Sequence, residues 1–291
     1  MKIFITGGSG LLGQYLNIKL SKNHEILSQY NLNQGNCNQF NSIKCSVTDY
    51  GEIEKIFESF KPDIVLHTAA ISNAERADKM AADEVYSINV TATKYLAEMC
   101  EKNKAKLIYT STDLVYAGYR GSFLKEDARL IPVSLYAETK LMGEVKIRET
   151  FDNYLILRVA LQYGFGLHHS RSHFQNVFDD LKQGKTVKLF SDQFRSALSI
   201  KESARMLSDL VTKEVKGETI NFGGVERISR YDLGLYLCEI SGTSKELVQP
   251  ITMDEAKAVY QVADVSMNVD KLNLLGIKSK PVKDSLIELF E

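Results

Sequence analysis

A tyrosine and a lysine four residues apart are the two side chains of this sequence best suited to acid–base chemistry. They are Tyr136 and Lys140, in the run Tyr-Ala-Glu-Thr-Lys. On a helix, residues four apart share one face, so Tyr136 and Lys140 can both point at one bound cofactor. A free phenol titrates at about pH 10, and a neighbouring cation lowers its pKa towards the range useful for proton transfer. We therefore predict that Tyr136 protonates a carbonyl oxygen and that Lys140 lowers the pKa of Tyr136.

A threonine and an aspartate at the end of an apolar run are further candidates. The stretch 106–112 is typical of a buried strand, and it ends at Thr112, directly before Asp113. In open α/β sheets, ligands bind outside the carboxyl ends of the strands. Thr112 could therefore hydrogen-bond the reacting oxygen, although a hydroxyl in this position can also cap a helix.

Three glycines near the N-terminus have the spacing of a dinucleotide-binding turn: Gly7, Gly10 and Gly13. They stand between a predicted strand over 2–6 and a predicted helix over 11–21. The first glycine permits a tight turn, the second lets the backbone approach a pyrophosphate, and the third lets the helix pack closely on the sheet. The helix start, at Leu11 and Leu12, offers free amides and the positive end of the helix dipole. This context predicts a bound dinucleotide.

The end of the second predicted strand, 24–30, bears on the choice between NAD and NADP. An NAD site commonly has an acid here, which binds the ribose 2′-hydroxyl. The residues from Gln29 to Gln34 include no acid and no base, and the next basic residue is Lys44. Since nothing there would repel a 2′-phosphate, we expect NADP or NAD, with NADP favoured. Lys140 would hold the nicotinamide ribose.

Apolar runs and amphipathic stretches alternate through the first part of the chain. Runs rich in Ile, Val and Leu without polar alternation are typical of parallel strands covered on both faces. The predicted strands are 2–6, 24–30, 63–70, 106–112 and 154–164, and the predicted helices are 11–21, 52–60, 81–102 and 136–150. This alternation predicts an α/β fold with a doubly wound parallel sheet of the Rossmann type.

After residue 164 the alternation is interrupted. The segment 165–195 is polar around one predicted helix near 174–184, whereas 202–211 and 217–224 return to a helix and a strand. The tail has two helical stretches with Pro250 between them. We therefore predict a dinucleotide-binding domain formed by residues 1–164 and 196–225. A smaller, interleaved substrate-binding lobe is predicted for residues 165–195 and 226–291.

Composition restricts the classes of partner. The chain has 291 residues, with 36 Lys and Arg against 37 Asp and Glu. The basic residues form no cluster, so a nucleic-acid-binding face is not expected. No apolar run approaches the roughly 18 residues that span a membrane, and the start does not resemble a secretory signal. The four cysteines form no CxxC pair, so we predict a cytoplasmic protein with neither disulfides nor a structural metal.

Seven short motifs occur in the order found in extended short-chain dehydrogenases/reductases. They are TGGSGLLG (6–13), HTAA (67–70), YSIN (86–89), STDLVYAG (111–118), YAETK (136–140), LRVALQYG (157–164) and SDQFR (191–195). The chain resembles this group over almost its whole length, and within the group it most resembles the dTDP-4-dehydrorhamnose reductase family. The resemblance implies hydride transfer from NAD(P)H to a keto group of a nucleotide-linked sugar.

Carried over by motif, the resemblance implies a catalytic trio of Thr112, Tyr136 and Lys140. It adds the pair Ala69 and Ala70 to the glycine turn at the cofactor. Two arginines could pair with a diphosphate, because a guanidinium fork suits phosphate oxygens. The residues that we expect to contact the substrate are thus Thr112, Asp113, Arg171 and Arg195.

The chain departs from this family's pattern in two places besides the end of the second predicted strand. Leu161 stands where the family usually has a tryptophan, and the family's DQxGxPT is replaced by residues 192–198, with Arg195 at its centre. Both departures concern the sugar more than the redox chemistry. Related 4,6-dehydratases carry Asp-Glu after the catalytic threonine, and this chain has Asp113-Leu114. Leucine cannot abstract a proton, so dehydration is disfavoured.

Three histidines, His168, His169 and His173, cluster near Arg171. No further ligand has metal-site spacing, so a polar substrate loop is the favoured interpretation. Two other functions stay open at this stage: a nucleotide-sugar epimerase that retains NAD, and a non-catalytic NADP-binding subunit like the regulatory subunit of methionine adenosyltransferase. A homodimer is possible.

Overall fold

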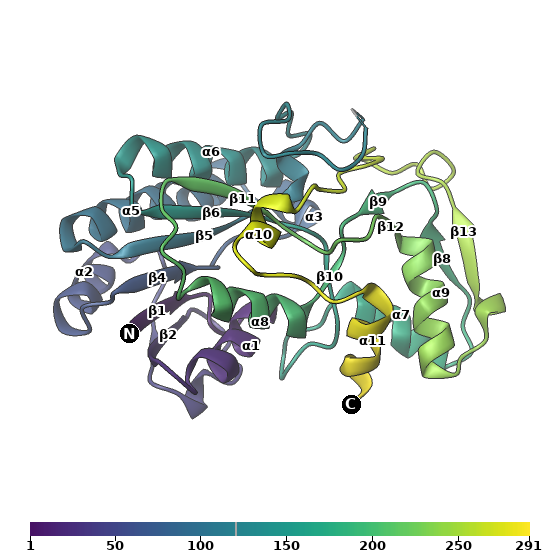
Figure 1. The fold of residues 1–291 in the computed structure, drawn as a ribbon, viewed down its shortest axis with the longest axis horizontal. Coiled ribbons are helices and arrows are strands. Elements are labelled where there is room, and N and C mark those ends of the chain that lie inside the picture. Colours follow the sequence, from purple (N-terminus) through teal and green to yellow (C-terminus); the bar gives the residue numbers. More distant parts are fainter. Residues whose placement is uncertain (120) are drawn as a thin grey trace.

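The computed structural model describes residues 1–119 and 121–291, and its central feature is a sheet of seven parallel strands (Figure 1). Their order across the sheet is β11 (Glu218–Phe222), β6 (Tyr154–Val159), β5 (Lys106–Thr112), β4 (Ile64–His67), β1 (Lys2–Thr6), β2 (Glu25–Tyr30) and β3 (Ser42–Lys44). The chain starts in mid-sheet and adds strands in both directions, which is the doubly wound topology. The predicted fold class is confirmed.

Helices cover both faces of this sheet, because successive strand residues point to opposite sides. In β1, Ile3 and Ile5 enter the core on one side and Phe4 enters the core on the other. The Ile3 side is covered by α1 (Leu11–Leu20), α8 (Ile200–Leu210) and the short α10 (Asp270–Leu274). The Phe4 side is covered by α2 (Tyr50–Ser59), α5 (Ala92–Asn103) and α6 (Leu135–Thr150).

The chain between β4 and β5 is less regular than predicted. The predicted helix over 81–102 is present as one continuous run of α4 (Ala82–Tyr86), a π-helical turn (Ser87–Thr91) and α5, and the short α3 (Ala74–Asp78) precedes it. Within the π turn, Asn89 accepts a hydrogen bond from Ile71 N at 2.8 Å and donates one to Ile71 O at 3.1 Å. A π turn widens the helix locally and is frequent at functional sites. Here it lets Asn89 hold the chain that follows β4.

The predicted strand 154–164 is interrupted after Val159. Its last part is β7 (Gln162–Tyr163), which pairs with β10 (Leu198–Ser199) outside the main sheet. Another small ladder joins β9 (Phe194–Arg195) to β12 (Ile228–Ser229). Short 3-10 turns lie at Cys37–Gln39, Asp113–Val115 and Lys245–Leu247. The extra strands direct the chain from the sheet into a second group of elements.

This second group has its own apolar core. It consists of α7 (His173–Lys182), α9 (Arg230–Ser241), α11 (Val282–Phe290) and the parallel pair β8 (Val187–Phe190) and β13 (Val248–Ile251). Pro250, predicted to separate helices, lies in β13. By contrast, Val269, Leu272 and Ile277 pack in the core on the α1 side of the sheet, although they fall within the predicted substrate lobe. The division into two lobes stays a prediction.

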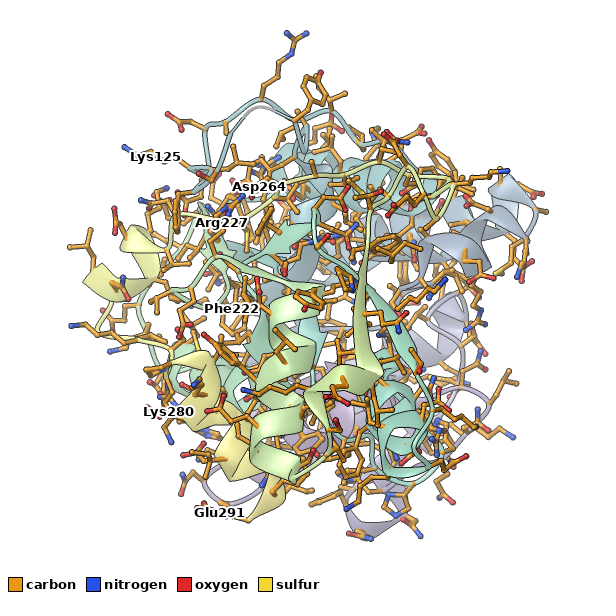
Figure 2. All side chains as sticks on the ribbon, turned by 90° about the vertical axis from the view of Figure 1, so that its right-hand side faces the viewer. Lys125, Phe222, Arg227, Asp264, Lys280 and Glu291 are labelled. Carbon is orange, nitrogen blue, oxygen red and sulfur yellow. The ribbon has the colours of Figure 1, made fainter. Side chains whose placement is uncertain are left out.

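The segment between β13 and α10 runs across the end of the sheet. Asp264 N donates to Gly118 O at 2.8 Å, and Phe194 N donates to Ala263 O at 2.7 Å. Figure 2 shows Asp264 beside Arg227, whose Nε donates to the carboxylate at 2.7 Å. The segment thereby links the second group of elements to the loop that follows β5. None of the helices in the described part of the chain is long and apolar enough to cross a membrane.

Candidate active site

The turn between β1 and α1 has the close approaches that its glycines were predicted to allow. Gly7 has a φ of 70°, and a Cβ at this position would lie 2.7 Å from Ala69 N. A Cβ at Gly13 would lie 2.2 Å from Gly7 O. Larger residues would force the backbone apart at both positions. The turn therefore packs against Ala69 on one side and against its own helix on the other.

Gly10 faces open space instead. A Cβ there would meet a single heavy atom of the described residues within 4 Å, Gly7 O at 3.2 Å. Gly10 is also the N-cap of α1, with no side-chain hydrogen bond at the cap and no acid in the first turn. The amides of Leu11 and Leu12 and the positive end of the helix dipole are left for an anion. The turn fits a dinucleotide pyrophosphate.

Gln29, near the end of β2, supports this turn in a way that the sequence did not indicate. Its side-chain Oε1 accepts a hydrogen bond from Gly7 N at 2.9 Å, and its Nε2 donates to Cys45 O at 2.5 Å. The sequence signal that could have revealed this role is a side-chain amide, Gln29, in a strand whose neighbouring residues are buried. The strand ends at Tyr30, so no carboxylate waits for a ribose hydroxyl at this position.

Thr112 and Tyr136 are brought together at the carboxyl edge of the sheet. Thr112 is the last residue of β5. Tyr136 lies in the first turn of α6, which starts after Ser134, whose hydroxyl accepts a hydrogen bond from Ala137 N. The Thr112 hydroxyl accepts a hydrogen bond from Leu114 N and donates one to Asp113 Oδ1, both at 3.3 Å, and it lies near enough to the Tyr136 phenol to lower the pKa of that phenol. Lys140 lies one turn further along α6, with its ammonium 4.0 Å from the centre of the Tyr109 ring. The trio expected from the sequence is therefore assembled on two adjoining elements.

The charges of this trio differ from the sequence-based expectation. Burial raises the pKa of Tyr136 to about 12, and the nearby Thr112 hydroxyl and the charge of Arg195 only partly oppose this rise. Burial lowers the pKa of Lys140 to about 7. The prediction that Lys140 lowers the pKa of Tyr136 is therefore wrong for the ligand-free protein, because desolvation outweighs the neighbouring charges. Tyr136 is a protonated phenol at neutral pH.

The lowered pKa of Lys140 predicts a pH-dependent stability. Between pH 7 and about pH 10.4 the unfolded chain carries a proton on this amine that the folded protein has lost, so stability rises with pH. We expect a slope of up to about 1.4 kcal/mol per pH unit in wild type, and a smaller slope in Lys140→Met. Urea unfolding from pH 6.5 to 9.5 measures it. Parallel slopes in the two proteins would contradict the lowered pKa.

A buried ion pair lies beside the trio. Arg195 Nη1 donates to Asp113 Oδ2 at 2.7 Å, and the two residues are 5% and 2% exposed. Asp113 directly follows Thr112, and both Asp113 and Arg195 act on the pKa of Tyr136. Among the residues that the structure describes, Arg195 Nε has no hydrogen-bond partner. A buried donor without an acceptor is costly, so this nitrogen fits an oxygen of a bound ligand.

A basic pocket of about 220 Å³ lies near this pair. It is lined by His173, Lys188 and Arg230, with Leu189 and Phe190. Burial and the charge of Arg195 together lower the pKa of Arg230 to about 10, so the two guanidinium groups are neighbours. The pocket can accept an anionic ligand that extends from the trio.

The model of the family described as "RmlD substrate binding domain" matches residues 1–291. The chain belongs to this family. A relative from Aggregatibacter actinomycetemcomitans, "dTDP-4-dehydrorhamnose reductase", is 24% identical over 253 residues, which are 84% of this chain and 81% of the relative. The "Methionine adenosyltransferase 2 subunit beta" of Xenopus laevis is 25% identical over 283 residues, 95% and 83% of the two chains.

Solved structures agree with this family assignment. A dTDP-4-dehydrorhamnose reductase from Clostridium acetobutylicum superimposes with a TM-score of 0.84 at 25% identity, covering 100% of this chain and 98% of that chain. The same enzyme from Bacillus anthracis, in complex with NADP, superimposes with a TM-score of 0.84 at 20% identity, covering 99% and 97%. At 20% identity the second comparison shows the fold alone.

Arg171 is not brought to the trio, although we expected it at the substrate. Its guanidinium donates to Asn176 and Asp179 on the exposed side of α7. Of the three clustered histidines, His173 reaches the basic pocket and His168 Nδ1 lies 3.0 Å from Gln14 Oε1, beside the glycine turn. Leu161, which stands where this family usually has a tryptophan, lines an apolar pocket next to Arg230. His168 and His173 thus lie at different places, one beside the glycine turn and the other at the basic pocket.

In residues 1–119 and 121–291, no group of three or more His, Cys, Asp or Glu side chains could hold a metal ion. The four cysteines are free and buried.

Proposed function

We propose that this protein is an NAD(P)H-dependent reductase of a keto group on a nucleotide-linked sugar. The observation that carries the proposal is the placement of the protonated Tyr136 phenol near Thr112, at the edge of the sheet that also holds the glycine turn. A reductase needs a proton donor at the substrate oxygen. With a pKa of about 12, the Tyr136 phenol holds its proton at neutral pH and can donate it. The similarity to dTDP-4-dehydrorhamnose reductases supports the same assignment.

Each group of the trio then has a role. NAD(P)H, when bound in the glycine turn, supplies the hydride for the keto carbon. Tyr136 donates its proton to the oxygen, and Thr112 hydrogen-bonds that oxygen and orients it. Lys140, in its protonated form, holds the nicotinamide ribose and stabilises the phenolate that Tyr136 becomes. Solvent then returns the proton to Tyr136.

The substrate would extend from the trio past Arg195. Its unpartnered Nε and the basic side chains of the neighbouring pocket suit the two phosphates of a nucleoside diphosphate. Asp113 holds the Arg195 guanidinium in place for this contact. We propose dTDP-4-dehydrorhamnose as the first sugar to test. We also propose that the protein is cytoplasmic and forms a homodimer, which light scattering can test.

Turnover with a panel of 4-keto nucleotide sugars tests the proposal. Loss of absorbance from NADPH or NADH with appearance of the reduced sugar is the expected result. An isomerised sugar without net loss of reduced cofactor would replace the reductase with an epimerase. Tight cofactor binding without turnover, together with a stable complex with a methionine adenosyltransferase catalytic subunit, would replace it with a regulatory subunit.

The open end of β2 predicts how cofactor preference can be changed. We expect Tyr30→Asp to weaken NADPH binding by roughly tenfold or more, because a carboxylate at this strand end repels the 2′-phosphate and can accept from a 2′-hydroxyl. NADH binding should be unchanged or stronger. Fluorescence titration with both cofactors measures the ratio. Tyr30→Asn is the matched neutral control, and an equal loss of NADPH affinity in that variant would rule out repulsion as the cause.

A further inference from the structure

A row of buried polar residues crosses three adjacent strands of the sheet behind the trio. Ser111 in β5 stands opposite Arg158 in β6, and Arg158 stands opposite Asn221 in β11. All three are buried, at 4%, 2% and 0% exposure. Their neighbours in these strands are mainly Ile, Leu and Tyr side chains of the two cores. A polar row in this position needs a reason beyond the packing of the sheet.

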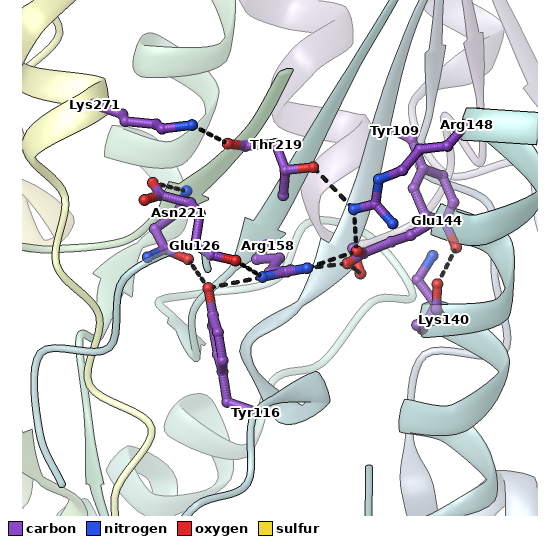
Figure 3. A network of polar contacts seen from close by, with 11 residues as sticks. Tyr109, Tyr116, Glu126, Lys140, Glu144, Arg148, Arg158, Thr219, Asn221 and Lys271 are labelled. Carbon is purple, nitrogen blue, oxygen red and sulfur yellow. Dashed lines mark hydrogen bonds and ion pairs between the residues drawn. The ribbon is translucent and has the colours of Figure 1, made fainter. Parts of the chain in front are cut away.

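Glu144, two turns along α6 from Tyr136, is the centre of this row. It is fully buried, and its carboxylate accepts hydrogen bonds from Ser111 Oγ at 2.6 Å and from Arg158 Nε and Nη2 at 3.1 and 2.9 Å. Arg148, one turn further along the helix, donates a fourth at 2.8 Å. Figure 3 shows Glu144 pointing from the helix towards Arg158, with Lys140 on the preceding turn.

Arg158 extends the contacts to the loop after β5. Its Nη1 donates to Tyr116 Oη at 3.0 Å and to Glu126 O at 2.8 Å. Tyr116 Oη in turn donates to Asn221 Oδ1 at 2.6 Å, and Asn221 N donates to Glu126 Oε1 at 3.0 Å (Figure 3). The pair of Glu144 and Arg158 therefore joins α6, three adjacent strands and this loop through hydrogen bonds alone.

We propose that Glu144 is a positioning residue, held in place by Arg158 and Ser111. It keeps the end of β5, which carries Thr112, against the first two turns of α6, which carry Tyr136 and Lys140. The inference rests on the proposed reductase function for its effect on turnover. Replacement of a buried ion pair by apolar side chains is often neutral for stability, so stability alone does not explain the pair. A positioning role explains the pair, because Glu144 contacts Ser111, the residue before Thr112, and lies one helical turn from Lys140.

The charge on Lys140 gives the pair a measurable signature. Around this ammonium lie His67 from β4, Tyr109 from β5 and Glu144 from α6, and Tyr136 precedes Lys140 by one turn of the same helix. His67 is buried and its pKa is lowered to about 3, so it is neutral. Burial lowers the pKa of Lys140, and the Glu144 carboxylate opposes this fall. Loss of the carboxylate should therefore lower the pH at which Lys140 titrates.

Glu144→Gln tests the proposal, because it keeps the shape and removes the charge. We expect kcat to fall by roughly 10–100-fold, since small misplacement of reacting groups has effects of this size, with KM changed less. The NMR titration midpoint of Lys140 in the ligand-free protein, assigned with Lys140→Met, should fall by about one pH unit. Glu149→Gln is the matched control on the same helix, because Glu149 is exposed and pairs with Lys146. It should change neither quantity.

A double variant separates positioning from stability. Glu144→Met with Arg158→Met leaves no unpaired buried charge, so it should fold even if Glu144→Gln does not. The proposal expects kcat and the Lys140 midpoint to stay low in this variant although its unfolding midpoint returns towards that of wild type. Recovery of both to wild-type values would overturn it, as would an unchanged Lys140 midpoint in folded Glu144→Gln. The titration needs no substrate, so a wild-type protein without turnover would refute the proposed function and leave the test of Glu144 valid.

Discussion

Tyr136→Phe will lower kcat by roughly 10²–10⁴-fold, the range for losing a general acid. The phenol is the group that carries the proton, because its pKa of about 12 keeps it protonated throughout the neutral range. Phenylalanine keeps the ring and its packing at the start of α6, so the fold and the glycine turn should be unaffected. Cofactor affinity should stay within about twofold of wild type, since Tyr136 contributes the proton more than binding.

Single-turnover measurements with saturating NADPH and substrate separate this loss from a binding defect. Tyr95→Phe is the matched control, because Tyr95 lies in α5 and its hydroxyl donates to Tyr50 O, away from the trio. That variant should turn over like wild type. Full activity in Tyr136→Phe would remove the phenol from its role and with it the observation on which the proposed function depends.

Arg195→Met will affect both stability and substrate binding. Removal of the guanidinium leaves Asp113 as a carboxylate that is 2% exposed and without its ion-pair partner. Breaking a buried pair in this way typically lowers the free energy of unfolding by about 3–5 kcal/mol. If Arg195 Nε binds a phosphate oxygen of the substrate, KM should also rise by roughly 10–100-fold, the effect of one charge-assisted hydrogen bond.

Two further variants identify the cause of each effect. Asp113→Asn with Arg195→Met should regain most of the stability, because it removes the unpaired charge, and it should keep the raised KM. Arg171→Met is the matched surface control: Arg171 pairs with Asp179 on the exposed side of α7, and its loss should change stability by at most about 1 kcal/mol and leave KM unchanged. A wild-type KM in Arg195→Met would exclude Arg195 from the substrate site.

Local patterns were sufficient for most of the architecture. The run of residues 2–6 followed by three spaced glycines led to a strand, a turn and a helix, and the structure has each of them with the backbone approaches that require glycine at positions 7 and 13. The parallel sheet followed from apolar strands without alternation. The π turn at Ser87–Thr91 was missed, because the helical pattern continues through it and Asn89 is satisfied by Ile71, a residue far away in the sequence.

The candidate site also contains residues that local patterns indicated and residues that they could not place. Tyr136, Lys140 and Thr112 were recognisable because helical spacing and strand ends are local properties. Arg171 and Arg195 were both candidates in sequence, with Arg195 favoured, and the structure places Arg171 on the surface of α7 and Arg195 at Asp113. The choice depends on which chain segment packs beside β5, and no local pattern contains that information.

By itself, the sequence determined the fold class and the glycine turn, and it indicated the candidate acid–base trio, since these depend on residue type and on spacing within one strand or one helix. Only the tertiary structure decided the charges of those groups and the residues behind them. Burial raises the pKa of Tyr136 and lowers that of Lys140. Folding also brings Glu144 together with Ser111 and Arg158, which lie on separate strands. Desolvation and contacts between distant segments exist only once the chain has folded, which is why spacing could not reveal them.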